Sequence, residues 1–283
     1  DFKYGAKLSL SDSQSKILRY GNPTGSLSKY VEGELIGNIY GYTTIGIAKT
    51  DEEMQQHLAS LPNGGQSALG SQWAAGDIMY ADLNGDGKIN NGSYTINDMG
   101  DMKKIGNSTP RFMTGINLDA AYKGWDLQMF WQGVLKRDWW PGDKNMTFWG
   151  VTDGEWWSTS FKEHLDYFRT SENPLGENLN SYYPRPIFNT KNNKSQTRYL
   201  QNAAYMRLKN IQVGYTFPKV WINKLMLQNL RIFVSGENLL TITSLSDTMD
   251  PETCGAGYQS TEQANGTVYP LAKTISFGLS VNF

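Results

Sequence analysis

The last ten residues of the chain alternate strictly between large apolar side chains and small or polar ones. The apolar positions are Ile275, Phe277, Leu279, Val281 and Phe283. A β-strand places successive side chains on opposite faces of its sheet, so this segment predicts a strand with one wholly apolar face. Such a face must be covered either by a protein core or by lipid.

Five further segments show the same alternation. Residues 112–122 and 125–131 flank Lys123-Gly124, a pair that suits a two-residue turn because glycine tolerates a positive φ. Tyr122 and Trp125 stand beside this turn, as aromatic residues do in the interfacial girdle of a membrane barrel. The remaining predicted strands are 1–11, 205–217 and 230–243.

The connections between these predicted strands differ greatly in length. The turns after Tyr122 and Phe217 are short, whereas residues 21–110, 134–203 and 244–268 form long connections. Because antiparallel strands alternate in direction, the long connections fall at one end of the sheet and the short turns at the other. Outer-membrane barrels have this asymmetry, with short periplasmic turns and longer extracellular loops.

Polar side chains of the central hairpin predict an inner face. Asp119, Asp126, Gln128 and Gln132 alternate with apolar residues, so in a barrel they would face the lumen while their neighbours meet lipid. Six strands cannot close a barrel, which needs about eight. The chain is therefore predicted to be all-β and to form the C-terminal strands of a large antiparallel transmembrane β-barrel. A soluble β-sandwich with long loops is the alternative that alternation alone leaves open.

Composition and motifs exclude several other classes of protein. Lys and Arg number 26 against 27 Asp and Glu, so the chain has no basic excess to hold nucleic acid. No stretch reaches the ~18 apolar residues of a membrane helix. The lone Cys254 cannot form an internal disulfide. His57 and His164 stand apart from it, and no hydrolase, nucleotide-binding or metalloprotease motif occurs. The sequence gives no indication of an enzyme.

An acidic segment in the first long connection resembles the first half of a calcium-binding loop. The predicted ligands are the side chains of Asp82, Asn84 and Asp86 and the backbone carbonyl of Lys88. Ser93 occupies the position where such loops carry a bidentate glutamate, so Asp98 or Asp101 would have to close the site. The segment predicts a bound Ca²⁺, with a solvated Asp- and Gly-rich turn as the alternative.

Tryptophan is concentrated in the second long connection, at Trp139, Trp140, Trp149, Trp156 and Trp157. Exposed aromatic rings stack on sugar rings and on peptide side chains. These residues are therefore predicted to contact a ligand or a partner near the mouth of a pore. The alternative is that their rings form a small core within the loop itself.

Taken together, many segments resemble the C-terminal region of SusC/RagA-type TonB-linked transporters of Bacteroidetes. In order and in rough spacing the matching segments are 37–42, 46–47, 76–89, 105–107, 110–112, 122–133, 205–211, 214–215, Pro218, 230–239, 250–252 and 269–271. They extend over almost the whole chain. The resemblance favours Asp101 as the closing carboxylate, because Ile105-Gly106-Asn107 follows it at the spacing of this family.

This resemblance implies a barrel of about 22 strands in the bacterial outer membrane, with a plug in its lumen. Residues 1–283 would be the C-terminal portion of that barrel, with the plug and the N-terminal strands upstream. The expected partners are membrane lipid, a SusD-like surface lipoprotein, the TonB complex through the N-terminal part, and an oligosaccharide or peptide ligand. Phe283 matches the terminal aromatic residue that barrel-assembly machinery reads. The alternatives are a secreted carbohydrate-binding β-module with a calcium-stabilised loop and a purely structural outer-membrane barrel.

Overall fold

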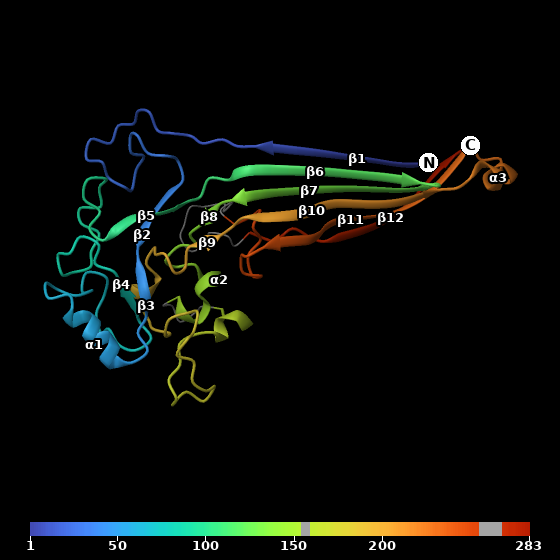
Figure 1. The fold of residues 1–283 in the computed structure, drawn as a ribbon. Helices are drawn as coiled ribbons and strands as arrows, with labels where there is room; N and C mark the ends of the chain where they lie inside the picture. The colour runs from blue at the N-terminus through green and yellow to red at the C-terminus, as the bar shows by residue number, and fades with distance from the viewer. Residues whose placement is uncertain (154–158, 255–267) are drawn as a thin grey trace.

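A computed structural model describes residues 1–153, 159–254 and 268–283. Its main feature is one antiparallel sheet of six long strands in the order β1-β6-β7-β10-β11-β12 (Figure 1). The strands are β1 Phe2–Ser11, β6 Arg111–Tyr122, β7 Trp125–Lys136, β10 Tyr205–Thr216, β11 Asn229–Thr243 and β12 Thr274–Asn282. These are the six strands predicted from the alternation of side chains, and their bounds differ from the predicted ones only at the ends. The all-β prediction is confirmed.

Smaller elements lie in the connections. Three small two-stranded antiparallel sheets pair β2 Asn38–Tyr42 with β5 Met102–Asn107, β3 Thr44–Ile47 with β4 Ile78–Tyr80, and β8 Asp138–Trp139 with β9 Gln201–Asn202. The helices are α1 Asp51–Ala59, α2 Met146–Trp149 and α3 Lys219–Ile222, with 3₁₀ turns at Gly150–Thr152, Lys162–Leu165, Lys191–Asn193 and Asn223–Leu225. Within the described residues, no helix combines the length and the hydropathy that crossing a membrane requires.

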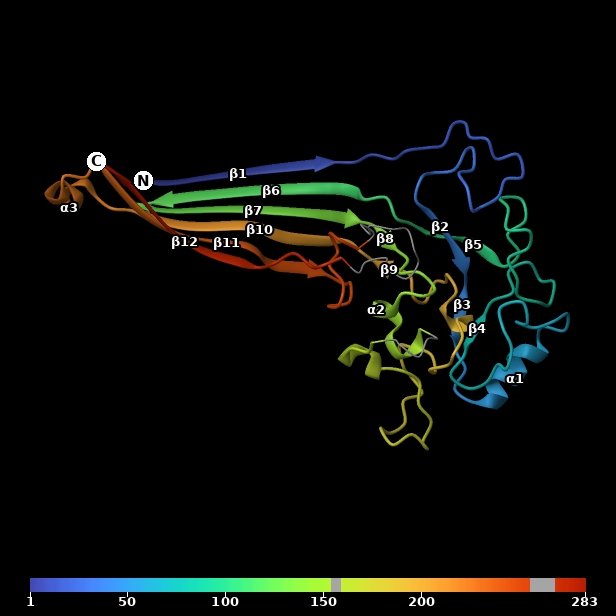
Figure 2. The same ribbon diagram turned by 180° about the vertical axis from the view of Figure 1, so that it is seen from behind.

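The two ends of the sheet differ sharply. The long connections gather at one end, whereas α3, the Lys123-Gly124 turn and both chain termini lie at the other (Figures 1 and 2). We call the described parts of residues 12–110, 137–204 and 244–254 the loop body. Alternating strand directions require this arrangement. That the loop body faces the outside of the cell stays a prediction.

One face of the sheet is apolar, and none of the residues that the structure describes forms a protein layer over it. The strand register aligns its side chains in rows, one of which is Tyr4, Ala120, Leu127, Val213, Val234 and Phe277. Tyr4 is 79% exposed and Phe277 82% exposed. Soluble proteins rarely expose so large a contiguous apolar surface. This apolar face is therefore the lipid-facing surface of a barrel wall, and the soluble sandwich is wrong for this chain.

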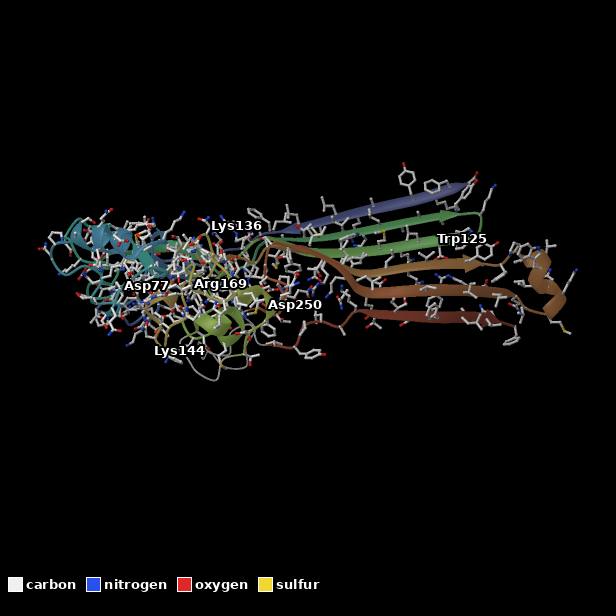
Figure 3. The ribbon with its side chains drawn as sticks, turned by 90° about the horizontal axis from the view of Figure 1, so that it is seen from below. Asp77, Trp125, Lys136, Lys144, Arg169 and Asp250 are labelled. Atoms are coloured by element: carbon white, nitrogen blue, oxygen red, sulfur yellow. The ribbon has the colours of Figure 1, made fainter. Side chains whose placement is uncertain are left out.

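The hydrophobic core lies in the loop body instead. Its largest buried side chains include Trp73, Tyr80, Phe148, Trp149 and Tyr199. Among the described residues, no member of this core comes from the six long strands. All three long connections contribute to it, and Figure 3 shows their side chains crowded together at that end of the sheet. The long connections thus fold as one packed unit rather than as separate loops.

A buried ion cluster joins the first connection to the second. The fully buried carboxylate of Asp77 accepts hydrogen bonds from Arg185 at 2.8 and 2.9 Å and from the Asn192 amide at 2.9 Å. The Nζ atom of Lys191, also buried, lies 2.8 Å from the same carboxylate. Burial opposes the charge on Asp77, but these bonds outweigh it and hold the pKa of the carboxyl below its usual value. The cluster fixes residues more than a hundred positions apart in sequence.

An arginine at Phe277, near the middle of β12, tests which face meets lipid. This substitution places a charge on the apolar face, so we expect it to lower the free energy of unfolding in lipid vesicles by about 2–4 kcal/mol. Ser276→Arg, on the opposite face of the same strand, is the matched control and should cost much less. Urea unfolding of the full-length protein in vesicles, followed by tryptophan fluorescence, measures both. Equal losses would contradict the assignment of faces.

Removal of the Asp77 carboxylate tests the buried cluster. Asp77→Ala leaves the Lys191 ammonium buried without its anion, so we expect the local free energy of opening to fall by about 3–5 kcal/mol. Native-state hydrogen exchange of residues 76–80 and 190–196 measures it. The control is Lys104→Ala, which removes a 2.7 Å pair with Glu34 at the surface and should cost about 1 kcal/mol or less.

The same cluster predicts a pH dependence. Because the pKa of Asp77 is depressed in the folded protein, its stabilisation is complete above the unfolded-state pKa and is lost as the pH falls through the folded-state value. Protection of residues 76–80 should therefore decline under acid conditions in the native protein. In Asp77→Ala that decline should be weaker; an unchanged acid dependence would show that other carboxyls are responsible.

Candidate functional site

The second face of the sheet carries the four residues predicted to line a lumen. Asp119 of β6 lies opposite Gln128 of β7, and opposed residues of an antiparallel pair share a face. Asp126 and Gln132 lie on that same face because they are an even number of residues from Gln128 along β7. The structure thus brings all four to one surface, which we call the polar face. That the polar face borders a barrel lumen stays a prediction.

An ion pair crosses the polar face over a whole strand. Arg231 of β11 donates to Asp126 of β7 through Nε at 3.1 Å and through Nη2 at 2.5 Å, although β10 lies between these strands. The pair passes above Gly214 of β10, where a Cβ atom would stand 2.5 Å from the guanidinium and 2.6 Å from the carboxylate. Glycine at 214 therefore leaves the space that the ion pair occupies. With its amide oxygen turned toward Arg231, Gln212 accepts two further bonds of 3.2 and 2.7 Å.

A second charged cluster attaches the loop body to the polar face. The buried guanidinium of Arg207 in β10 lies 2.8 Å from Asp250 and 3.4 Å from Glu252, and Lys209 lies 3.1 Å from Glu252. Burial disfavours the charge on Asp250, but the Arg207 hydrogen bond, together with those from the backbone N–H groups of Glu252 and Leu271, outweighs it and lowers the pKa of the carboxyl. Arg207 stands opposite Gln132, so the cluster lies on the polar face. Figure 3 shows Asp250 where the loop body meets the sheet.

This attachment continues along β7 into the following connection. Arg137 donates hydrogen bonds to the backbone carbonyls of Cys254 at 2.9 Å and Pro251 at 3.4 Å. The segment 250–254 is therefore held by Arg207 of β10 and by Arg137, which directly follows β7. Sequence reasoning missed both contacts, because nothing in the spacing of the residues links positions 137 and 207 to position 250. The resemblance did single out 250–252, but it assigned no contact to that segment.

The predicted calcium loop keeps its shape through bonds to its own backbone. Asp82 accepts hydrogen bonds from two glycine N–H groups at 2.7 and 2.9 Å. Asp101 accepts from the N–H groups of Leu83 at 2.9 Å and Asn90 at 2.8 Å. Burial, helped by the nearby charge of Asp82, raises the pKa of the Asp101 carboxyl. The loop therefore holds the two carboxylates close together.

The other predicted ligands of the loop have local roles. Asn84 accepts from the backbone N–H of Asp86, and Asp86 accepts from that of Lys88, at 2.9 and 3.1 Å. Asp98, the alternative closing carboxylate, binds Ser93 at 2.6 and 2.8 Å instead. In the part of the chain that the structure describes, no group of three or more His, Cys, Asp or Glu side chains is placed to hold a metal ion. A bound Ca²⁺ stays a prediction.

The tryptophans of the second connection are turned inward. Trp139 and Trp149 are 2% and 0% exposed, and Trp140 is half-buried with its ring 6.1 Å from that of Trp149. Direct ligand contact is therefore wrong for Trp139 and Trp149, because their rings belong to the core of the loop body. Trp156 and Trp157 lie outside the described residues.

The remaining reactive side chains have structural contacts. His164 is buried, and its Nδ1 accepts from the Phe161 N–H at 2.8 Å. Cys254 is buried too, and burial raises the pKa of its thiol. Neither residue presents a nucleophile to a ligand. Phe283 is 84% exposed beyond the end of β12, and its role in barrel assembly stays a prediction.

Comparison with known proteins identifies relatives of this chain. No protein-family model matches the chain. It is 30% identical over 260 residues to TonB-dependent receptor P3 of Formosa agariphila, a match that covers 89% of the chain and 22% of that receptor. It is 23% identical over 316 residues to TonB-dependent receptor P39 of the same organism, covering 100% of the chain and 28% of the receptor.

Solved structures show the same fold. The RagAB peptide transporter matches with a TM-score of 0.64 at 18% identity, covering 100% of this chain and 27% of that one. The RagAB peptide importer in its closed-closed state matches with a TM-score of 0.60 at 16% identity, covering 100% and 28%. The chain thus spans about a quarter of the length of the proteins it matches. Its sequence is similar to part of these TonB-dependent receptors and its fold to part of the RagAB barrel, and these are proteins of the bacterial outer membrane.

Proposed function

We propose that the protein carrying this chain imports oligosaccharides or peptides across the outer membrane in a TonB-dependent process. Its relatives are receptors and transporters rather than enzymes, and one structural neighbour is a peptide transporter. In this proposal the ligand enters at the end of the loop body and passes along the polar face. A SusD-like surface lipoprotein covers the loop body, and the TonB complex acts through other parts of the receptor.

The observation that carries this proposal is the pairing of an exposed apolar face with a hydrogen-bonding polar face. Gln128, Gln212 and the Asp126–Arg231 pair offer donors and acceptors of both kinds. Hydroxyl groups of sugars and backbone amides of peptides can bond to such groups equally well. The loop body is fixed to this face through Arg207 and Asp250, so the entrance is built from a packed unit.

Two alternative functions, a secreted carbohydrate-binding module and a purely structural barrel, would require different surfaces. A secreted carbohydrate-binding module would have to keep its outer surface in water, which the apolar face does not allow. A purely structural barrel would need neither a polar face of this composition nor a ligand. Transport measurements separate it from the proposed importer.

Narrowing the polar face tests the proposed route. Gln128→Trp adds bulk to the lumen side of β7, so we expect uptake to fall by about tenfold, the equivalent of about 1.4 kcal/mol. Met129→Trp, on the lipid side of the same strand, is the matched control and should leave uptake unchanged. The measurement is uptake of labelled oligosaccharide and peptide mixtures by cells that make the full-length receptor, normalised to its surface abundance.

The same cells test whether uptake depends on TonB and whether the receptor has a lipoprotein partner. Uptake should disappear without functional TonB, and the receptor should co-purify with a surface lipoprotein. Import of neither mixture would favour the structural barrel. An equal effect of the two tryptophan substitutions would contradict passage along the polar face.

We also propose that the calcium-type loop binds Ca²⁺ through the neighbouring carboxylates of Asp82 and Asp101, with water completing the coordination. Millimolar Ca²⁺ should then raise the thermal unfolding midpoint of the loop body in the full-length receptor. Asp101→Asn should remove this response, because it removes the carboxylate that closes the site. Asp98→Asn is the control, since Asp98 bonds to Ser93 and should leave the response intact. No rise in the native protein would overturn this proposal.

A further inference from the structure

The connection between β10 and β11 carries exposed apolar side chains at the end of the sheet opposite the loop body. It runs from residue 217 to residue 228 and contains α3 and the 3₁₀ turn Asn223–Leu225 (Figure 1). Val220 is 77% exposed, Trp221 60% and Met226 88%. In water, the exposure of three large apolar side chains within seven residues is energetically unfavourable. They indicate a surface that has a partner in the membrane.

A chain of aromatic rings shows which way this connection faces. Trp125 and Tyr215 lie opposite each other on the apolar face, with ring centroids 5.0 Å apart. Tyr215 contacts Phe217 at 5.1 Å, and Phe217 contacts Trp221 at 6.3 Å. Trp221 therefore continues the lipid-facing surface beyond the end of the strands. It lies on the side away from the polar face.

Local hydrogen bonds hold the connection in this orientation. The N–H of Trp221 donates to the carbonyl of Pro218 at 3.0 Å, and that of Gln228 donates to Asn282 of β12 at 2.8 Å. Ile222, next to the exposed Trp221, is only 2% exposed. One side of α3 is thus packed against the protein, and the other presents Val220 and Trp221. The exposed residues are held in a fixed position.

The charged residues of this connection are all basic. Residues 217–228 contain Lys219 and Lys224 and no acidic residue, and Lys123 stands in the neighbouring β6–β7 turn. Lysine beside tryptophan is the composition of a protein surface at a membrane interface, where the ring sits at headgroup level and the ammonium reaches the phosphates. Anionic phospholipid attracts such basic segments.

We propose that residues 217–228 form a membrane-interface anchor, which seats on anionic phospholipids at the end of the barrel opposite the loop body. Val220, Trp221 and Met226 enter the boundary between headgroups and acyl chains, and Lys219 and Lys224 contact lipid phosphates. The anchor fixes the depth and tilt of the β10–β11 hairpin in the bilayer. It does not depend on which ligand the receptor transports.

A fluorescent label at position 220 tests the contact with lipid. The full-length receptor with Val220→Cys and Cys254→Ser is labelled with bimane and placed in nanodiscs of phosphatidylethanolamine and phosphatidylglycerol. We expect quenching by lipid that carries a nitroxide near its headgroup and little quenching by iodide in solution. Leu175→Cys in the same background is the control, because Leu175 is 62% exposed in the loop body and should be quenched by iodide.

Two other results at position 220 would overturn the anchor. Strong quenching by iodide would place Val220 in water. Protection from both quenchers would mean that another protein segment covers the connection, so the partner would be a protein and not lipid.

Charge reversal tests the contact with phosphate. We expect anionic lipid to raise the thermal unfolding midpoint of the native receptor relative to zwitterionic lipid. Lys219→Glu with Lys224→Glu should remove at least half of that rise. Lys16→Glu with Lys29→Glu, a matched pair in the first connection at the other end, should leave it intact. An unchanged rise in the first pair would contradict the proposed phosphate contacts.

Discussion

The structure depends on one constraint, which is that the six long strands have lipid on one side. In lipid a backbone group cannot bond to water, so each strand must be paired within the sheet and its outward side chains must be apolar. The register satisfies both demands across the interior strands β6, β7, β10 and β11. Apolar side chains are thereby committed to the bilayer. The buried core is consequently found in the loop body, where apolar side chains pack together away from water, as in a soluble protein.

This separation explains why charged groups hold the parts of the molecule together. Arg207 of β10 attaches Asp250 to the sheet by an ion pair, and Arg137, directly after β7, holds Pro251 and Cys254 through hydrogen bonds to their backbone carbonyls. Within the loop body, Asp77 joins two connections in the same way. Such clusters are specific in geometry, because a buried charge left without its partner costs several kcal/mol. They fix the position of the loops more than they add to stability.

The strands could be predicted from the sequence because alternation is a local property, and Lys123-Gly124 fixed the register of the central hairpin. The long-range clusters could not, since Asp77 and Asn192 are 115 residues apart and no local pattern relates them. Aromatic content alone also failed to separate ligand contact from core, and Trp139 and Trp149 proved to be core. Asp101 was placed beside the calcium-type loop by resemblance to a family, and the bonds of Asp101 to Leu83 and Asn90 agree with that placement.

The Asp126–Arg231 pair favours water as the solvent of the polar face. Both side chains remain about a quarter exposed or less, at 25% and 21%. On a lipid-facing surface a pair of ions would face a large desolvation cost, whereas on a wet surface the same pair costs little. The row of apolar side chains that contains Phe277, on the other face, is instead more stable in lipid than in water. A wall that prefers lipid on one side and water on the other is what a water-filled path through a membrane requires, and the loop body is attached to the polar face of this sheet.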